Sequence, residues 1–257
     1  LTGLGVASGF LIYFFIFMYG VMVMRGVMEE KTSRIVEVIV SSVRPYQLML
    51  GKIVGVALVG LTQFLIWVIL SGIAFTVLGA LFAPDVMEQA QSGNLESRAE
   101  VAGLNAGETL SLLASVNWFT LIGTFIFYFL GGYLLYSSLF AAIGAAVDAE
   151  SDTQQFMLPV TLPLIFSIVL AMNIIKNPHG AVAGIFSIVP FTSPVVMMSR
   201  VPFNPDLWQV ILSMALLVLT FLGTTWLAAR IYRIGILSYG KKVNYKDLGK
   251  WLFQKNL

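Results

Sequence analysis

The chain has 257 residues, of which 58% are hydrophobic and 11% charged, and its formal net charge is +2. A charged fraction so far below the roughly 25% of soluble domains argues against a soluble globular protein. The sequence contains no cysteine, which excludes disulfides, thiolate metal sites and a cysteine nucleophile within this chain.

Five apolar runs are long enough to cross a lipid bilayer. A hydrocarbon core of about 30 Å needs about 20 residues at a helical rise of about 1.5 Å. Because lipid cannot satisfy exposed backbone N–H and C=O groups, the predicted fold class is an all-α membrane protein, a polytopic transmembrane helix bundle. The predicted spans cover residues 4–24, 53–83, 118–147, 156–175 and 207–229.

Charge asymmetry between the loops predicts the orientation. Residues 25–52 carry five basic side chains, whereas residues 84–117 carry one basic side chain and five acids. Basic residues in short loops mark the cytoplasmic side, so 25–52 is predicted to be cytoplasmic and 84–117 extracytoplasmic. Residues 230–257 hold seven basic side chains and one acid, which indicates a basic cytoplasmic tail.

Another cytoplasmic turn is predicted at residues 148–155, between the third and fourth spans. Ser151 and Gln154 have the spacing of a capping box, which predicts that the fourth span begins there. Asp148, Glu150 and Asp152 are interpreted as a solvated turn, with a contact to a soluble partner as the alternative.

Residues 181–206 contain four prolines and interrupt the pattern of continuous spans. Five crossings already connect the predicted outer start of the chain with a cytoplasmic tail, so a sixth would invert the tail. Proline removes helical hydrogen bonds and forces turns, and we interpret 181–206 as an outer re-entrant helical hairpin. The alternative is an ordinary kinked span with an external tail. The centre of the predicted hairpin is Pro190, Phe191, Thr192, Ser193 and Pro194.

The cytoplasmic loop 25–52 has a two-faced pattern at helical spacing. One arc is apolar, with Met28, Ile35, Val36, Ile39 and Val43, and the opposite arc is polar, with Glu30, Arg34, Glu37 and Ser41. The pattern predicts an amphipathic helix whose acids pair with Arg34 and which ends at Arg44-Pro45. Pro45 suits the first turn of the next helix, which leads into the second span. Such a helix is either an interfacial anchor or a lever held by a soluble partner; a strand is disfavoured at a bilayer surface.

Three stretches resemble the permease subunits of ABC type-2 exporters, in particular the branch that includes sodium-exporting permeases. They read EEKTSRIVEVIVSSVRPYQLMLGKIVGV, VPFTSPVVM and AARIYRIGILSYGKK. The resemblance implies a coupling helix at 29–42, a re-entrant pair at 181–206 and a separate ATPase subunit. The residues that it assigns to ATPase coupling are Glu29, Glu30, Arg34, Glu37, Ser41 and Ser42.

The resemblance also implies partners and a location. The partners are a cytoplasmic ABC ATPase, a second permease copy or related permease, and membrane lipids, without nucleic acid, in a bacterial or archaeal plasma or inner membrane. No cofactor is expected in this chain, because ATP and magnesium would bind the ATPase. Family members have a further first span and an extracytoplasmic domain, so a chain that opens at Leu1 is expected to be a fragment of a longer permease.

Enzymatic activity is not expected. Residues 235–241 match the Gly-x4-Gly-Lys spacing of a phosphate-binding loop, but Lys242 replaces the Ser or Thr that would hold magnesium. An intramembrane serine protease would need Ser8 to meet His179, which lies in a predicted outer loop. An ion-coupled secondary transporter is the stronger alternative, although the predicted spans lack the ionisable residue that such carriers use. The cargo stays open among sodium, lipid, drug and peptide.

Overall fold

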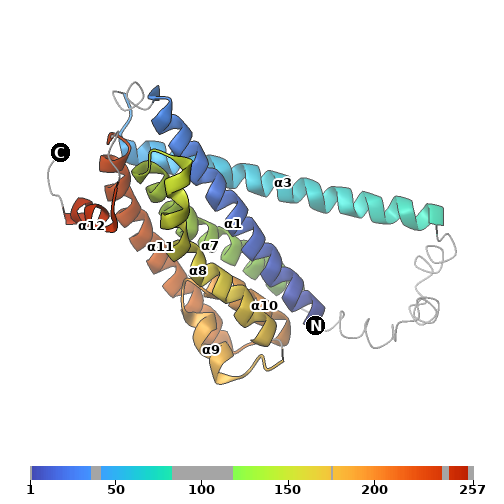
Figure 1. Ribbon diagram of the computed structural model, residues 1–257. Helices are drawn as coiled ribbons and strands as arrows, with labels where there is room; N and C mark the ends of the chain where they lie inside the picture. The colour runs from blue at the N-terminus through green and yellow to red at the C-terminus, as the bar shows by residue number, and fades with distance from the viewer. Residues whose placement is uncertain (1, 36–41, 83–117, 175, 239–242, 254–257) are drawn as a thin grey trace.

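The computed structural model describes residues 2–35, 42–82, 118–174, 176–238 and 243–253, and all regular structure in these ranges is helical. Figure 1 shows the arrangement. The elements are α1 (Thr2–Thr32), α3 (Pro45–Phe82), α7 (Trp118–Ala146), α8 (Glu150–Ile174), α9 (Ala181–Ile188), α10 (Ser193–Arg200), the 3₁₀ turn η1 (Val201–Phe203), α11 (Leu207–Gly235) and α12 (Tyr245–Phe253).

Five of these helices, α1, α3, α7, α8 and α11, are long and apolar enough to cross a membrane. This confirms the predicted helical class and the predicted number of spans. Large apolar side chains such as Phe10, Phe166 and Leu219 are exposed on the outside of the bundle. An apolar exterior is what a helical bundle presents to lipid, because the backbone polar groups are already paired within each helix.

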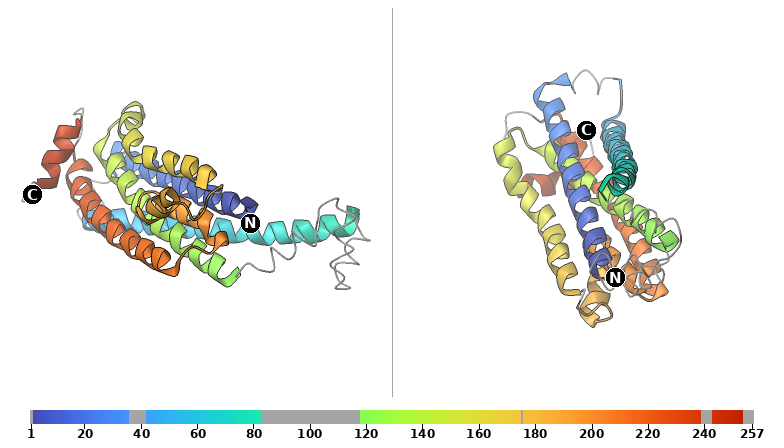
Figure 2. Two further views of the ribbon diagram at one scale, coloured as in Figure 1. Left: turned by 90° about the horizontal axis from the view of Figure 1, so that it is seen from below. Right: turned by 90° about the vertical axis from the view of Figure 1, so that its right-hand side faces the viewer.

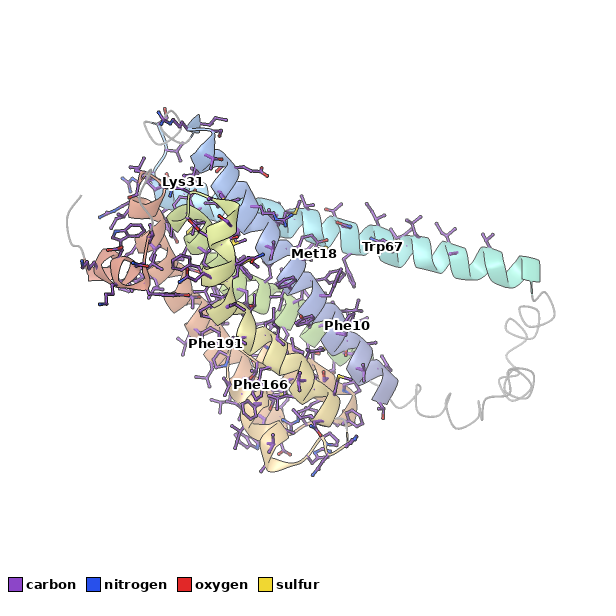
Figure 3. All side chains as sticks on the ribbon, viewed as in Figure 1. Phe10, Met18, Lys31, Trp67, Phe166 and Phe191 are labelled. Atoms are coloured by element: carbon purple, nitrogen blue, oxygen red, sulfur yellow. The ribbon has the colours of Figure 1, made fainter. Side chains whose placement is uncertain are left out.

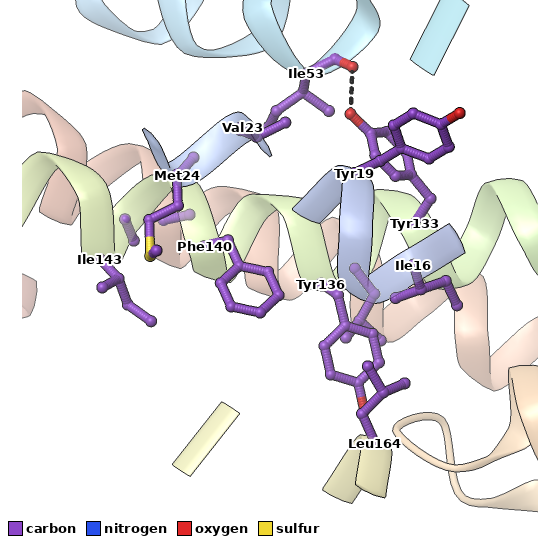
Figure 4. Close-up of a cluster of buried hydrophobic side chains, with 14 of the residues drawn as sticks. Ile16, Tyr19, Val23, Met24, Ile53, Tyr133, Tyr136, Phe140, Ile143 and Leu164 are labelled. Atoms are coloured by element: carbon purple, nitrogen blue, oxygen red, sulfur yellow. Dashed lines mark hydrogen bonds between the residues drawn. The ribbon is translucent and has the colours of Figure 1, made fainter. Parts of the chain in front are cut away.

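Helices α1 and α7 form the centre of the bundle. The buried residues of α1 recur every three or four positions, as at Ile12, Ile16, Tyr19 and Val23, so one face of this helix packs inward. Figure 4 shows that face against the aromatic side chains of α7. The Tyr133 hydroxyl donates to the Ile53 carbonyl at 2.8 Å, which ties α7 to the first part of α3.

Helix α3 leaves the bundle along its length. Its first part is packed, and Ile53 is buried. Farther along, the helix extends away from the other helices in both Figure 1 and Figure 2, and the Trp67 side chain is 62% exposed. The later turns of α3 therefore contribute little to the core formed by the other helices.

The bundle has two distinct ends. At the first, which we call the loop end, lie the last turns of α1, α7 and α11, the first turns of α3 and α8, and α12. At the other, the hairpin end, lie the first turns of α1, α7 and α11, the last turn of α8, and α9 with the last turn of α10. Helices α1, α7 and α11 therefore run from the hairpin end to the loop end, and α8 runs in the opposite direction, as the loop charges predict.

Several boundaries differ from the prediction. Helix α8 begins at Glu150, so Ser151 lies inside the helix instead of capping it. Helix α11 continues to Gly235, because long arginine side chains suit a helix and extend toward a polar surface. Helix α12 was not predicted; its apolar residues Leu248, Trp251 and Leu252 recur at helical spacing within a tail dominated by charge.

Candidate functional site

The end of α1 carries two oppositely charged neighbours, Glu30 and Lys31. Glu30 forms an ion pair with Lys52 of α3, with 2.7 Å between the carboxylate and Nζ. The side chains of Lys52 and Glu30 are 16% and 27% exposed. This pair joins the last turn of α1 to the first turns of α3, across the loop that connects them.

Lys31 is the most deeply buried charge at the loop end, with 1% of its side chain exposed. Its Nζ lies 2.7 Å from Asp148 and donates to the Ala145 carbonyl at 2.8 Å. Figure 3 places Lys31 where α1 meets the turn between α7 and α8. The Ala145 carbonyl belongs to the last turn of α7, where the helix dipole favours a cation, so Lys31 also caps α7.

Together these contacts connect α1 to α3, to the last turn of α7 and to the turn that leads into α8. Adjacent residues of a helix point about 100° apart, so Glu30 and Lys31 can contact different neighbours: α3 on one side and the α7–α8 turn on the other. Gly144 accommodates the close approach, because a Cβ there would collide with the Met24 carbonyl. A displacement at the end of α1 would therefore act directly on α3, α7 and α8.

Two buried polar atoms at the loop end have no hydrogen-bond partner among the described residues. They are Oε2 of Glu30 and the hydroxyl of Tyr232 on α11. Unsatisfied buried polar groups are few in folded proteins and raise the free energy of the arrangement that contains them. Glu30 therefore has one carboxylate oxygen in the ion pair with Lys52 and one without a hydrogen-bond partner among the described residues.

The predicted coupling helix at 29–42 is not confirmed. Glu29 and Glu30 belong to α1, which ends at Thr32, and Arg34 is left-handed with φ 56°. A left-handed L-residue interrupts a right-handed helix, so a continuous helix does not run from Glu29 through Arg34. Ser42 lies in an exposed turn before α3, which begins at Pro45 as predicted. Glu37 and Ser41 fall outside the described residues.

The predicted hairpin residues 190–194 lie deep in the bundle. The Phe191 carbonyl accepts a hydrogen bond of 2.7 Å from the Tyr136 hydroxyl, midway along α7. A Cβ added to Gly132 would lie 2.8 Å from the Pro194 ring, so the turn packs tightly against α7. The Thr192 hydroxyl donates to the Phe186 carbonyl at 2.6 Å, which closes the turn between α9 and α10.

Helix α10 is buried along its whole length, from Ser193 to Arg200. Its last turn lies at the hairpin end, where a Cβ on Gly5 would come within 2.5 Å of the Ser199 carbonyl. Both α9 and α10 have eight residues, or about 12 Å of helix. Neither helix alone is long enough to span a bilayer.

Arg200, the last residue of α10, holds this helix against α9 and the loop before α9. Its guanidinium is buried and donates from Nε to the Pro178 carbonyl at 2.7 Å, and from Nη1 to the Ala183 carbonyl at 3.3 Å. It also donates to the Ser187 hydroxyl of α9. These bonds join the end of α10 to the loop before α9 and to the first and last turns of α9.

Sequence reasoning missed Lys31, Asp148, Lys52 and Arg200 as structural contacts. The sequence did indicate that Lys31 could be buried, because Met24, Val27 and Lys31 recur at intervals of three and four residues on the buried face of α1. Arg200 gives a weaker signal, since only its position after the apolar segment VVMM suggests burial.

The geometry gives little support for catalysis. The Ser8 hydroxyl donates to the Leu4 carbonyl at 2.7 Å, within its own helix. Among the described residues, no group of three or more His, Asp or Glu side chains gathers as a metal site would require.

Five apolar helices of spanning length define a multi-pass protein of the cell membrane. Residues 3–230 match the sequence profile described as "ABC-2 family transporter protein". The chain therefore belongs to the ABC-2 family of transporter membrane proteins. This family supplies the membrane component, the permease, and not the ATPase, and it normally partners with a cytoplasmic ABC ATPase.

Two curated relatives are similar over nearly the whole chain. "Uncharacterized protein YhaP" of Bacillus subtilis (strain 168) is 33% identical over 240 residues, which cover 93% of this chain and 52% of the relative. "Uncharacterized protein MJ1024" of Methanocaldococcus jannaschii is 29% identical over 247 residues, covering 96% and 53%. The chain thus spans about half the length of these relatives. No solved structure is significantly similar. The predicted family is confirmed, and the sodium-exporting branch is not.

Proposed function

We propose that this chain is the permease subunit of an ATP-driven exporter, forms the translocation pathway and is coupled to a separate ATPase at the loop end. The observation that carries the proposal is the paired contact of Glu30 with Lys52 and of Lys31 with Asp148. A partner that moved the end of α1 would move three spans at once. ATP and magnesium would bind the ATPase, and Glu29, exposed on the last turn of α1, is the described acid best placed to meet it.

We propose that residues 25–52 form the coupling loop, which includes Glu37 and Ser41, two residues outside the described ranges. A second permease copy or a related permease would complete the pathway. The cargo stays open among sodium, lipids, drugs and peptides. The long apolar exterior of α3 beyond Leu58 supports an extended contact with lipid or with a second permease.

We further propose that residues 181–206 are re-entrant from the extracytoplasmic side. Three features support this arrangement: the turn at 190–194 reaches the middle of α7, both ends of the segment lie at the hairpin end, and Arg200 closes its base. Irregular backbone at membrane depth is tolerated where protein covers it, and α10 is fully buried. The loop end, with its basic residues, would then face the cytoplasm.

Cysteine labelling tests this topology, because the chain has no native cysteine. Single cysteines at Lys176 and Leu207, both exposed, should react with an impermeant maleimide in intact cells. A cysteine at Ser33, equally exposed at the loop end, should react only after the membrane is permeabilised. Reaction of Lys176 and Leu207 from opposite faces would replace the hairpin with a crossing.

Reconstitution tests the energy source. Vesicles that contain the full-length permease and its ATPase should export cargo when ATP is supplied, and hydrolysis should rise with the transported compound, screened from sodium to amphipathic compounds. An imposed ion gradient without ATP should give no transport above that of empty vesicles. Transport that follows the gradient alone would favour the secondary carrier, which the sequence left as the main alternative.

A further inference from the structure

A cavity of about 420 Å³ opens at the loop end between α11, α12 and the start of α3. Its long wall is one face of α11, on which lining residues recur at helical spacing from Leu222 to Ile234. Trp251 of α12 and Tyr46 of α3 form the other sides. The cavity therefore depends on three elements that are distant in sequence, and it lies apart from the Glu30 and Lys31 contacts.

Two arginines give the cavity a positive charge. The Arg230 guanidinium lies 4.1 Å from the centre of the Trp226 ring and donates from Nη1 to the Leu252 carbonyl at 2.7 Å. These contacts fix the group, and its other N–H donors have no partner among the described residues. Arg233, almost one turn farther along, is exposed, and none of the described residues that line the cavity is acidic.

The apolar part of the cavity continues along a spanning helix. Leu222 and Trp226 are both exposed on α11, on the bilayer side of the two arginines. A ligand that satisfies both parts has an anionic phosphate for the arginines and an apolar chain for the wall. A free phosphate would leave that wall unused, because only the arginines would contact it.

We propose that this cavity binds an anionic phospholipid of the inner leaflet. Its phosphate would meet Arg230 and Arg233, and an acyl chain would lie along Leu222 and Trp226. Aromatic and basic side chains at the ends of spanning helices are suited to the headgroup region.

The bound lipid would also support α12. This helix is held by the bond from Arg230 to the Leu252 carbonyl and by the Tyr245 hydroxyl, which donates to the Gln155 carbonyl at 2.7 Å. Trp251 packs near Gly235 of α11, where a Cβ would lie 3.2 Å from its ring. A lipid that contacts both α11 and Trp251 adds a further connection between the tail and the bundle.

Native mass spectrometry of the purified full-length permease tests the proposal without any ATPase, so its outcome is independent of the proposed transport. With equal acyl chains, phosphatidylglycerol should be retained in preference to phosphatidylethanolamine. Arg233→Gln should reduce that retention about fivefold, the effect of one basic side chain near a membrane surface. Arg233→Lys should retain most of it.

Arg44→Gln is the matched control, because Arg44 is also exposed at the loop end but does not line the cavity. Equal retention of the two lipids would overturn the proposal, and so would equal losses in Arg233→Gln and Arg44→Gln. A competition with sn-glycerol 3-phosphate separates a lipid from a phosphate site. Weak displacement of phosphatidylglycerol supports the lipid, whereas full displacement at matched concentration shows that phosphate alone is the ligand.

Discussion

Lys31→Met is expected to destabilise the bundle by about 2–4 kcal/mol, because it leaves a carboxylate and a helix-terminal carbonyl without their shared cation. Methionine retains the length and the apolar contacts of the buried side chain, so the loss reports mainly on the contacts with Asp148 and the Ala145 carbonyl. For a chain of this size, the thermal midpoint in detergent should fall by roughly 5–10 °C. Fluorescence-detected thermal unfolding of the purified permease measures this difference.

Lys52→Met provides the matched control, since it makes the same chemical change in a pair that is more exposed to solvent. Its effect should be smaller, because solvent screens the remaining Glu30 carboxylate. The double variant Lys31→Met/Asp148→Asn should recover part of the loss by removing the carboxylate charge that Lys31 contacted. If Lys31→Met were no less stable than Lys52→Met, Lys31 would not hold α1 to the α7–α8 turn.

The spans could be predicted from the sequence because membrane thickness imposes one length on all of them. The number of spans and the start of α3 at Pro45 agree with the structure. The break in the segment after α8 was predicted from prolines, which act locally on the backbone. How deep the turn at 190–194 lies in the bundle was not predicted, because this depth depends on long-range contacts such as the one between Tyr136 and Phe191.

The contacts at the loop end were harder to predict, because a charged side chain there can be either exposed to solvent or buried in an ion pair. Glu30, Lys31 and Arg34 were interpreted as parts of an amphipathic helix, yet Lys31 is buried and Arg34 is left-handed. A sequence pattern cannot distinguish a solvated lysine from one whose partner, Asp148, is more than one hundred residues away. Only the packing of α1 against α7 brings these two side chains together.

Glu29→Arg is expected to weaken association with the ATPase about a hundredfold while the permease folds normally. Glu29 is exposed on the last turn of α1, and a cation there suits the helix dipole better than an acid does. Like charges across an interface cost several kcal/mol, and about 2.8 kcal/mol corresponds to a hundredfold change. Glu30 is the poorer test, because its reversal would also break the ion pair with Lys52.

Co-purification of the ATPase with the full-length permease, quantified across a charge series at Glu29, tests the central claim most directly. Wild type should retain the ATPase, Glu29→Gln should retain less and Glu29→Arg almost none, at unchanged thermal midpoints. Lys176→Glu, a charge reversal at an exposed position of the hairpin end, should retain it fully. Wild-type retention by Glu29→Arg would contradict docking of a separate ATPase on the end of α1.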